Sequence, residues 1–342
     1  MSASIRRVAV TGGAGYVGSA LVPDLLSAGY AVTVLDWFLY GRDVFGEAAS
    51  DPRLRLAAVD IRDEAAVTQA FAGADAVIHL ACVSNDPSFE LDPALGRSIN
   101  YDAFPGLLRA ARANRVRRFI YASSSSVYGV KAEPDVREDA SCEPLTDYSR
   151  YKLLCERLLV EADLGECEWV IARPATLCGY APRLRLDLTV NILTIHALAT
   201  GVITVYGGSQ LRPNLHIADM VRAYRLLLEA PGAQIHRQIF NVGYQNRSLA
   251  ELAELVRREA GRPGVQVTVR PTHDLRSYHI NADRIRERLG FVPQGSLEQA
   301  VRDLSAAYRA GRLQDPLANP RYYNIRTMQA HVAAAALAGA NR

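Results

Sequence analysis

A glycine-rich turn near the start of the chain, between a short apolar run and a helix-like run, is the feature that most constrains the fold. Residues 8–10 are apolar, residues 12–18 follow the pattern G-x-x-G-x-x-G, and residues 17–27 have apolar side chains at helical spacing. Glycine permits unusual dihedral angles and lets the backbone approach a pyrophosphate without a Cβ in the way. A helix that follows such a turn offers free amide groups and a positive dipole end to phosphates. The pattern alone is weak, but its place at a strand-to-helix turn favours a dinucleotide site.

The first half of the chain alternates strand-like and helix-like segments. The strand-like runs are residues 5–11, 31–35, 54–59, 76–80, 119–122 and 170–172, and the helix-like runs include 17–27, 64–71, 107–114 and 151–161. Short apolar strands that alternate with helices predict a parallel sheet covered on both faces and wound right-handedly. The predicted fold class is α/β, a Rossmann-type doubly wound parallel sheet with a smaller α/β substrate-binding lobe toward the C-terminus.

The rhythm changes after about residue 173, where loop-forming glycines and prolines become frequent. Helix-like segments near 188–199, 218–228, 249–260 and 282–289 and a strand-like segment at 265–269 indicate the smaller lobe. We expect residues 1–175 to form the dinucleotide-binding domain, which the chain re-enters around 216–243. Residues 176–215 and 244–330 would form the lobe, and residues 331–342 an alanine-rich tail without assigned chemistry.

Composition excludes several classes of protein. The 342 residues are 49% hydrophobic and 22% charged, as in ordinary globular proteins. A net charge of +3 indicates neither a nucleic-acid nor a membrane partner. The five cysteines show no C-x-x-C spacing, so neither a disulfide framework nor a metal site is expected. No signal-peptide pattern and no bilayer-length apolar run is present, so a cytoplasmic location is expected.

Acidic residues follow the second and third predicted strands. Asp36 ends the second strand, where a Rossmann carboxylate hydrogen-bonds the adenosine ribose hydroxyls. A carboxylate there would repel a 2′-phosphate, which favours NAD over NADP. The alternative is an ordinary solvated aspartate at the end of a strand. Asp60 is placed to hydrogen-bond the adenine ring.

Tyr148 and Lys152 form the pattern Y-x-x-x-K on a predicted helix, so both side chains share one face. A free tyrosine, with a pKa of about 10, is a poor base at neutral pH. A nearby ammonium group and a positive nicotinamide ring would stabilise the phenolate. Among 39 basic residues only Lys131 and Lys152 are lysine, although arginine would serve as well on a solvated face.

A run of serines, residues 123–126, follows the strand-like residues 119–122. Ligands of open parallel sheets bind at the carboxyl ends of strands. A serine hydroxyl there can share a hydrogen bond with a catalytic tyrosine and with the substrate oxygen that is oxidised. The alternative is an ordinary serine-rich loop.

Together these motifs resemble the extended short-chain dehydrogenase/reductases, specifically the NAD-dependent nucleotide-sugar epimerase/dehydratase family, over roughly residues 5 to 300. The resemblance implies that Tyr148 is the acid/base and that Lys152 binds the nicotinamide ribose and tunes the tyrosine. It implies that Ser124 is the hydroxyl partner. It also implies NAD as cofactor, a nucleotide sugar as substrate, and a homodimer.

The motifs and the resemblance place further residues around the two ligands. The expected cofactor contacts are Gly12, Gly15, Tyr16, Val17, Gly18, Asp36, Asp60, Ile61, Leu80, Ala81, Asn100, Tyr148 and Lys152. The expected substrate contacts are Ser84, Asn85, Ser125, Ser126, Thr176, Asn191, Arg212 and Arg276. The resemblance implies that the last three lie at the nucleotide diphosphate, and the two arginines suit that role because a planar guanidinium pairs bidentately with phosphate oxygens. The basic loop 183–185 is expected to shape the sugar pocket.

Two departures from the family pattern bear on the reaction. The family's 4,6-dehydratases carry an Asp-Glu pair after the catalytic hydroxyl, whereas this chain has Ser125 and Ser126. A serine is a far weaker base than glutamate, so ordinary 4,6-dehydration is disfavoured. Thr176 stands where family members often have asparagine. The leading hypothesis is a 4-epimerase that works through a transient 4-keto sugar. The alternatives are a nucleotide-sugar 4-dehydrogenase, a dehydratase with another base, and a non-catalytic NAD-binding protein.

Overall fold

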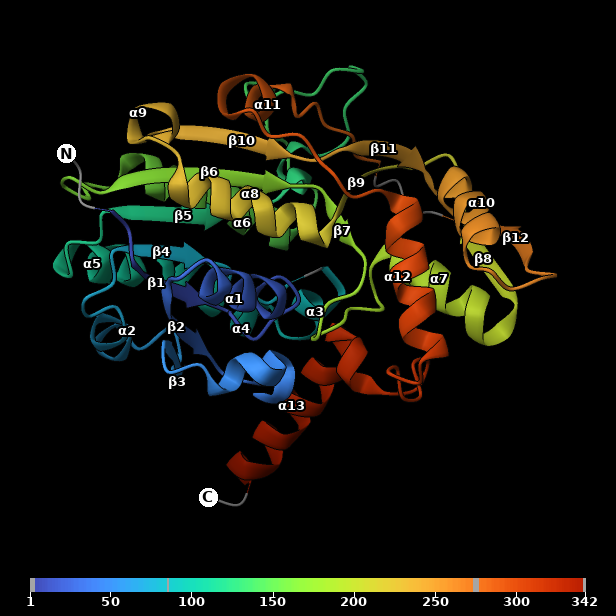
Figure 1. The fold of residues 1–342 in the computed structure, drawn as a ribbon, viewed down its shortest axis with the longest axis horizontal. Coiled ribbons are helices and arrows are strands. Elements are labelled where there is room, and N and C mark those ends of the chain that lie inside the picture. The colour runs from blue at the N-terminus through green and yellow to red at the C-terminus, as the bar shows by residue number, and fades with distance from the viewer. Residues whose placement is uncertain (1–3, 85, 273–276, 341–342) are drawn as a thin grey trace.

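A seven-stranded parallel sheet forms the centre of the structure, a computed structural model that describes residues 4–84, 86–272 and 277–340 (Figure 1). Its strand order is β10-β6-β5-β4-β1-β2-β3, and every neighbouring pair is parallel. The strands are β1 (Arg7–Thr11), β2 (Ala31–Asp36), β3 (Leu54–Ala58), β4 (Ala76–His79), β5 (Arg118–Ala122), β6 (Glu168–Pro174) and β10 (Gln238–Val242). The order reverses between β1 and β4, which opens a crevice at their carboxyl ends. The predicted α/β fold class is confirmed.

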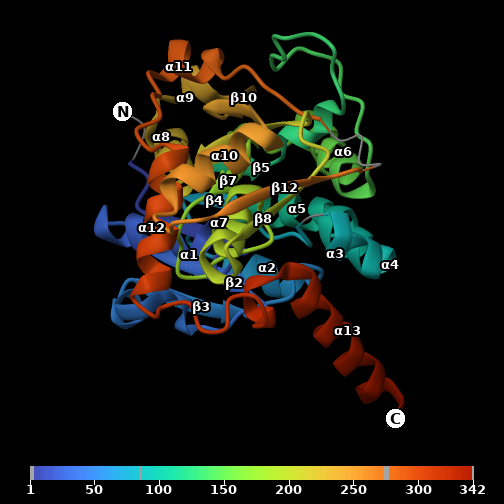
Figure 2. The same ribbon diagram turned by 90° about the vertical axis from the view of Figure 1, so that its right-hand side faces the viewer.

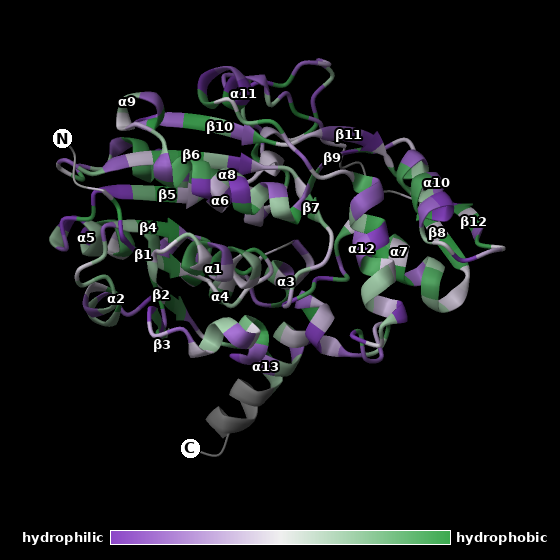
Figure 3. Ribbon diagram, in the orientation of Figure 1, coloured by the Kyte–Doolittle hydropathy of each residue, from purple (hydrophilic) through white to green (hydrophobic). Residues whose placement is uncertain are grey.

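Helices cover both faces of this sheet, as the continuous apolar strands require (Figure 3). On one face lie α1 (Gly18–Ser27), α8 (Ile217–Glu229) and the short η1 (Asp43–Ser50). On the other lie α2 (Glu64–Ala70), α5 (Phe104–Ala113) and α6 (Asp147–Glu161). The short α9 (Gly232–Ile235) leads from α8 into β10, so residues 217–242 return to the large sheet. Within the described part of the chain, no helix combines the length and the apolar character needed to cross a membrane.

The lobe consists of two small sheets and the helices that pack on them. One sheet has the order β11-β9-β7 and the other pairs β12 with β8. These strands are β7 (Thr176–Cys178), β8 (Val202–Tyr206), β9 (Leu211–His216), β11 (Gln245–Ser248) and β12 (Gln266–Arg270), and the helices are α7 (Thr189–Thr200), α10 (Leu249–Glu259), α11 (Asp283–Leu289) and α12 (Leu297–Arg309). Helix α12 was not among the predicted helices, although Leu297, Val301 and Leu304 recur at helical spacing and are buried.

The C-terminal helix α13 (Asn324–Ala340) leaves the lobe and returns to the large-sheet domain (Figures 1 and 2). There it packs against α3 (Asp86–Leu91). Residues 324–330, which we expected in the lobe, therefore lie on the other domain, and the helix runs on past the expected boundary at 331. The remaining short helices are α4 (Pro93–Arg97), η2 (Ser98–Asp102), η3 (Ser125–Tyr128) and η4 (Pro320–Tyr322).

A buried histidine links the two strands that flank the crevice. His79, at the end of β4, is 4% exposed, and its Nδ1 lies 2.6 Å from Oγ1 of Thr11 in β1. Its ring stacks on Tyr121 of β5, with 5.8 Å between ring centroids. Burial, with a smaller contribution from the charge of Lys152, lowers the pKa of His79 to about 3. His79 is therefore neutral in the folded protein at any pH at which the protein would be handled.

This histidine should make the folded protein less stable in acid. An unfolded histidine titrates near 6.5, so between about pH 6.5 and pH 3 the unfolded chain binds the extra proton and the folded chain does not. The free energy of unfolding should fall across that window, by on the order of 5 kcal/mol from this residue. Urea unfolding at several pH values should show a shallower decline for His79→Gln than for the wild type. Parallel curves for the two proteins would contradict the assignment.

Candidate functional site

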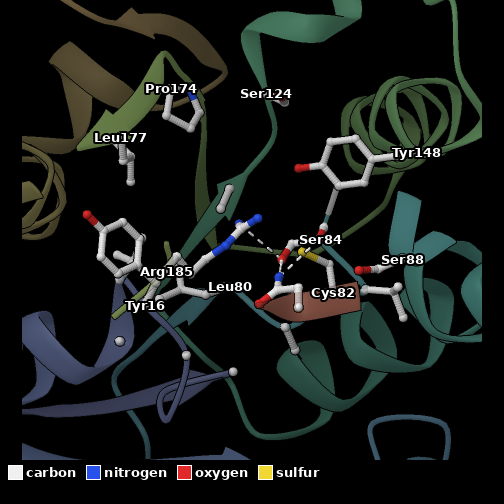
Figure 4. Close-up of a pocket in the computed structure, with 18 of the residues that line it drawn as sticks. Tyr16, Leu80, Cys82, Ser84, Ser88, Ser124, Tyr148, Pro174, Leu177 and Arg185 are labelled. Atoms are coloured by element: carbon white, nitrogen blue, oxygen red, sulfur yellow. Dashed lines mark hydrogen bonds between the residues drawn. The ribbon is translucent and has the colours of Figure 1, made fainter. Parts of the chain in front are cut away.

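A pocket lies at the carboxyl edge of the large sheet, where it meets the lobe (Figure 4). It extends from the glycine-rich turn to the lobe strand β9. The pocket brings together these predicted site residues: Gly12, Gly15, Tyr16, Val17, Gly18, Asp36, Ile61, Leu80, Ala81, Ser84, Ser124, Ser125, Ser126, Tyr148, Lys152, Thr176 and Arg212. Asn85 and Arg276 lie outside the described residues.

The glycine-rich turn has the shape that a dinucleotide requires. Gly12 has a φ of +70°, and a Cβ on it would lie 2.6 Å from the backbone nitrogen of Ala81. A Cβ on Gly18 would lie 2.3 Å from the carbonyl oxygen of Gly13, so that position also excludes a side chain. Gly15 lines the pocket, and no side chain of the described residues caps the first turn of α1. The turn thus presents backbone and a helix N-terminus to the cavity, which fits the diphosphate of NAD.

The carboxylate of Asp36 lies in this pocket beside the turn. Its Oδ2 accepts a hydrogen bond from the Ala14 amide at 2.9 Å, and its Oδ1 accepts one from the Phe38 amide at 2.7 Å. Burial raises its pKa, although these amides and the charge of Arg183 oppose the shift. Asp60 is absent from the lining of the pocket and binds Arg62, with 2.6 Å between Oδ2 and Nη2.

Tyr148 and Lys152 both reach the pocket from α6, as the spacing predicted. The helix starts with a capping box between Thr146 and Ser149, which fixes the turn that carries Tyr148. Lys152 is buried, and its Nζ donates to the Ala122 carbonyl at 2.7 Å. The Nζ atom lies 5.9 Å from the centroid of the Tyr148 ring.

Ser124 lies beside the phenol of Tyr148, at the N-terminus of η3. Its hydroxyl lines the same pocket as that phenol, and a second hydroxyl, that of Ser126, lies 2.8 Å from its Oγ. Burial raises the pKa of Tyr148 above its usual value, as do nearby Cys82 and Asp86, while Arg185 and Ser124 act to lower it. The phenol is therefore protonated at neutral pH in the protein alone.

The pocket contains a second cation, Arg185, whose side chain lies across the pocket from the phenol of Tyr148 (Figure 4). It pairs with both carboxylate oxygens of Asp187, at 2.9 and 3.1 Å, and its Nη1 lies 3.4 Å from Oγ of Ser84. We expected Lys152 to be the cation that favours the phenolate of Tyr148. The structure adds Arg185 as a second such cation, because the loop between β7 and α7 folds back over the sheet.

Two predicted contact residues are buried behind the pocket wall. Asn191 does not line the pocket: its Oδ1 accepts from the Gly179 amide at 2.9 Å, and its Nδ2 donates to the Arg185 carbonyl at 2.8 Å. Asn191 thus holds the loop that carries Arg185, and the structure does not bring it to a diphosphate site. Asn100 exchanges hydrogen bonds with the backbone of Val83 at 2.8 and 3.0 Å, and it braces the pocket wall.

Several pocket residues were not among our predicted contacts. They are Trp37, Leu39, Tyr40, Cys82, Ser88, Tyr278, Asn324 and Met328, among others. Asn324 and Met328 belong to α13, to which we assigned no chemistry. Sequence alone held no signal for them, since a helix of alanine-rich composition does not reveal which surface it will contact.

Comparisons with known proteins agree with this geometry. The model of the NAD dependent epimerase/dehydratase family matches residues 8–243. A dTDP-glucose 4,6-dehydratase from Streptomyces niveus is 29% identical, covering 92% of this chain and 96% of its own length. A UDP-glucose 4-epimerase from Lacticaseibacillus casei is 27% identical, covering 84% and 91%.

Solved structures show the same likeness. The dTDP-glucose 4,6-dehydratase from Streptomyces venezuelae, solved with NAD bound, superposes with a TM-score of 0.81 at 26% identity, covering 91% of this chain and 99% of the other. The UDP-glucose 4-epimerase of Thermus thermophilus, in complex with NAD, gives 0.75 at 25% identity, covering 89% and 99%. Epimerases and dehydratases therefore resemble this chain about equally well.

Proposed function

Because this chain belongs to the NAD-dependent epimerase/dehydratase family, we propose that it is a nucleotide-sugar 4-epimerase acting through a transient 4-keto sugar. One observation carries this choice over dehydration. Tyr148 and Ser124 share the pocket with Ser125 and Ser126, which stand at the two positions where the family resemblance implies an Asp-Glu pair in dehydratases. The pocket thus has the groups that oxidise a hydroxyl and lacks a carboxylate at those two positions.

In this proposal Tyr148, as phenolate, takes the proton from the sugar 4-hydroxyl, and Ser124 shares the hydrogen bond. Lys152 holds the nicotinamide ribose and, with Arg185, favours the phenolate. NAD, held at the glycine-rich turn, by Asp36 and by Lys152, would supply a reversible hydride acceptor for C4. Between these steps the keto sugar turns over, and the hydroxyls around it accept either orientation. Tyr148 then returns its proton to the oxygen, so the protein ends unchanged.

A dehydratase with another base is the second candidate, and one contact favours it. Asp86 lines the pocket near Tyr148, and its charge raises the pKa of that phenol. A carboxylate at this place could remove a carbon-bound proton from a 4-keto sugar. A nucleotide-sugar 4-dehydrogenase would need only Tyr148, Ser124 and Lys152 and would release the oxidised sugar.

Product analysis in deuterated water separates these reactions. Purified protein would be offered a panel of nucleotide sugars, and the products examined by mass and proton spectra. An epimerase should give a product of unchanged mass, with inverted C4 and no deuterium on carbon. Loss of two hydrogens would indicate a dehydrogenase. Loss of water with deuterium at C5 would indicate a dehydratase, and Asp86→Asn should then abolish the deuterium incorporation.

The assembly and location of the protein are also part of this proposal. The family resemblance implies a homodimer, and we propose a cytoplasmic location. Sedimentation of the purified protein would test the first prediction. Fractionation of the source cells would test the second.

A further inference from the structure

A second arginine of the lobe loop, Arg183, lies in the pocket as an incompletely satisfied cation. The loop joins β7 to α7, and the Arg183 side chain is 4% exposed. Its buried Nε atom has no hydrogen-bond partner among the residues that the structure describes. Its guanidinium stacks over Tyr40, 3.6 Å from the ring centroid. The nearby Asp187 is already bound through both oxygens by Arg185, so it does not supply Arg183 with a dedicated counterion.

The position of Arg183 places its charge beside the glycine-rich turn. Its backbone amide donates to Oγ of Ser19, in the first turn of α1, at 3.1 Å. Its charge also acts on the carboxylate of Asp36, at the end of β2. In a Rossmann sheet the cofactor diphosphate lies between these two features, above the helix N-terminus. A guanidinium without a dedicated counterion at this place faces the part of NAD that carries two negative charges.

The side chain that holds Arg183 in place comes from the far end of the sequence. Oδ1 of Asn324, the first residue of α13, accepts hydrogen bonds from Nη2 of Arg183 and from the Tyr40 hydroxyl. Its Nδ2 donates to Oγ of Ser84 at 2.7 Å, and its amide donates to Asp187 at 3.2 Å. Asn324 thus binds Arg183 directly and also contacts Ser84 and Asp187, the two side chains that Arg185 contacts.

Apolar and ring contacts keep α13 in that position. Met328, one turn further along the helix, is 5% exposed and packs in the core cluster under the sheet. The ring of His331 lies 5.5 Å from that of Trp37, which follows β2. Figure 2 shows that α13 starts at the body of the molecule and projects away from it toward the C-terminus. The helix is therefore anchored on the cofactor side of the pocket.

We propose that Arg183 binds the diphosphate of NAD and that Asn324 of α13 is the positioning residue that aims it. A phosphate oxygen would satisfy the buried Nε and balance the charge. The need for a counterion is visible in the protein alone, where burial lowers the pKa of Arg183 to about 10. Because Asn324 and Tyr40 are neutral, the guanidinium charge remains available to the ligand. A carboxylate in their place would neutralise that charge.

Ligand dissection on cofactor-free protein tests this inference without any turnover. Dissociation constants for NAD, ADP-ribose and adenosine would be measured by calorimetry. Arg183→Gln should weaken NAD and ADP-ribose about 10- to 100-fold, the range expected for a lost charge-assisted hydrogen bond, with adenosine changed less than about threefold. Asp36→Ala should also weaken the binding of adenosine, because Asp36 is expected to contact the ribose. Asn324→Ala should weaken only the diphosphate ligands, by about three- to tenfold.

Further variants separate binding from folding. Arg183→Lys keeps the charge but loses the planar fork, so its loss should be intermediate. Asn324→Asp would pair with the guanidinium and should weaken diphosphate binding despite its similar shape. Arg312→Gln is the matched control, because Arg312 also lies over a tyrosine, 4.8 Å from the ring centroid of Tyr180, but outside the pocket lining. Thermal unfolding would confirm that each variant is folded.

Two results would overturn the inference. Unchanged binding of NAD and ADP-ribose by Arg183→Gln would show that the guanidinium does not contact the diphosphate. An equal loss for adenosine would show that Arg183 only supports Tyr40 and Asp36. NADP, as a fourth ligand, tests a different role: if Arg183→Gln weakened the binding of NADP while leaving that of ADP-ribose unchanged, the arginine would bind a 2′-phosphate instead.

Discussion

Tyr148→Phe should lower turnover by at least about a hundredfold and as much as ten-thousandfold, the range for loss of a general acid/base. The phenylalanine ring fills the same space but can neither take nor return a proton. Binding of NAD should change little, because the rest of the cofactor site stays in place. Initial rates on the best nucleotide sugar and calorimetric titration with NAD would measure the two effects separately.

The pH dependence of the wild type adds a second readout. Burial holds the pKa of Tyr148 above its usual value, so little phenolate is present at neutral pH in the protein alone. Since the deprotonated form is the base, the rate of substrate oxidation should rise with pH. Arg185→Gln should move that rise to higher pH, because the charge of Arg185 lowers the pKa of the phenol.

Tyr151→Phe is the matched control for Tyr148→Phe. Tyr151 lies on the same helix, contacts Phe89 and Tyr101, and does not line the pocket. Its hydroxyl should be dispensable for turnover. Full activity in Tyr148→Phe, or an equal loss in Tyr151→Phe, would remove the proposed role of Tyr148.

The largest effect on stability should come from a buried ion pair behind the serine run. Glu156 of α6 and Arg173 of β6 are each 3% exposed, and the guanidinium meets both carboxylate oxygens, at 3.0 and 2.6 Å. The carboxylate also binds the Ser123 hydroxyl, and Arg173 donates to the Tyr128 hydroxyl at 2.8 Å. The pair therefore ties α6, which carries Tyr148, to the strand ends beneath the pocket.

Glu156→Gln should lower the free energy of unfolding by about 3 to 5 kcal/mol, because it leaves the buried charge of Arg173 uncompensated. Burial opposes that charge, and the contact with Glu156 is the main influence that holds the pKa of Arg173 above its usual value. Urea unfolding would measure the loss. Turnover should fall too, since the helix that carries Tyr148 loses its anchor.

Two further variants test the reason for this loss. The double variant Glu156→Met with Arg173→Met should recover much of the stability, because it removes both charges and keeps an apolar volume. Arg112→Gln breaks an exposed ion pair with Asp163, 3.0 Å long, and should cost less than about 1 kcal/mol. A loss in Arg112→Gln equal to that in Glu156→Gln would mean that burial of the pair is not the cause.

Local patterns were enough to predict the sheet and much of the pocket. The strand-to-helix turn depends on Gly12 and Gly18, which are close in sequence. The shared helix face of Tyr148 and Lys152 likewise depends only on their spacing of four residues. Their place at the carboxyl edge follows from the parallel order of the strands, which places these ends together. The serine run after β5 reaches this edge for the same reason, whereas the family resemblance singled out Ser124 within the run.

Contacts between distant segments could not be predicted in this way. Asn191 has a residue type suited to a diphosphate, but the structure buries it behind the pocket, where its amide group binds two backbone groups and the Tyr16 hydroxyl. Asp60 follows a strand as expected, but a neighbouring arginine pairs with it. A side chain's chemistry states what it can bind, whereas packing decides which partner it meets.

The sequence by itself thus determined the parallel α/β fold and the meeting of the glycine-rich turn, Tyr148, Lys152 and the serine run at one pocket, since each depends on short-range spacing and chain order. Only the tertiary structure decided that the loop with Arg183 and Arg185 folds over the sheet and that Asn324 closes the pocket from the C-terminal helix. These contacts join segments about 140 residues apart. They exist because burying Met328 and the neighbouring apolar surface brings α13 back onto the first domain, and no local pattern encodes that choice.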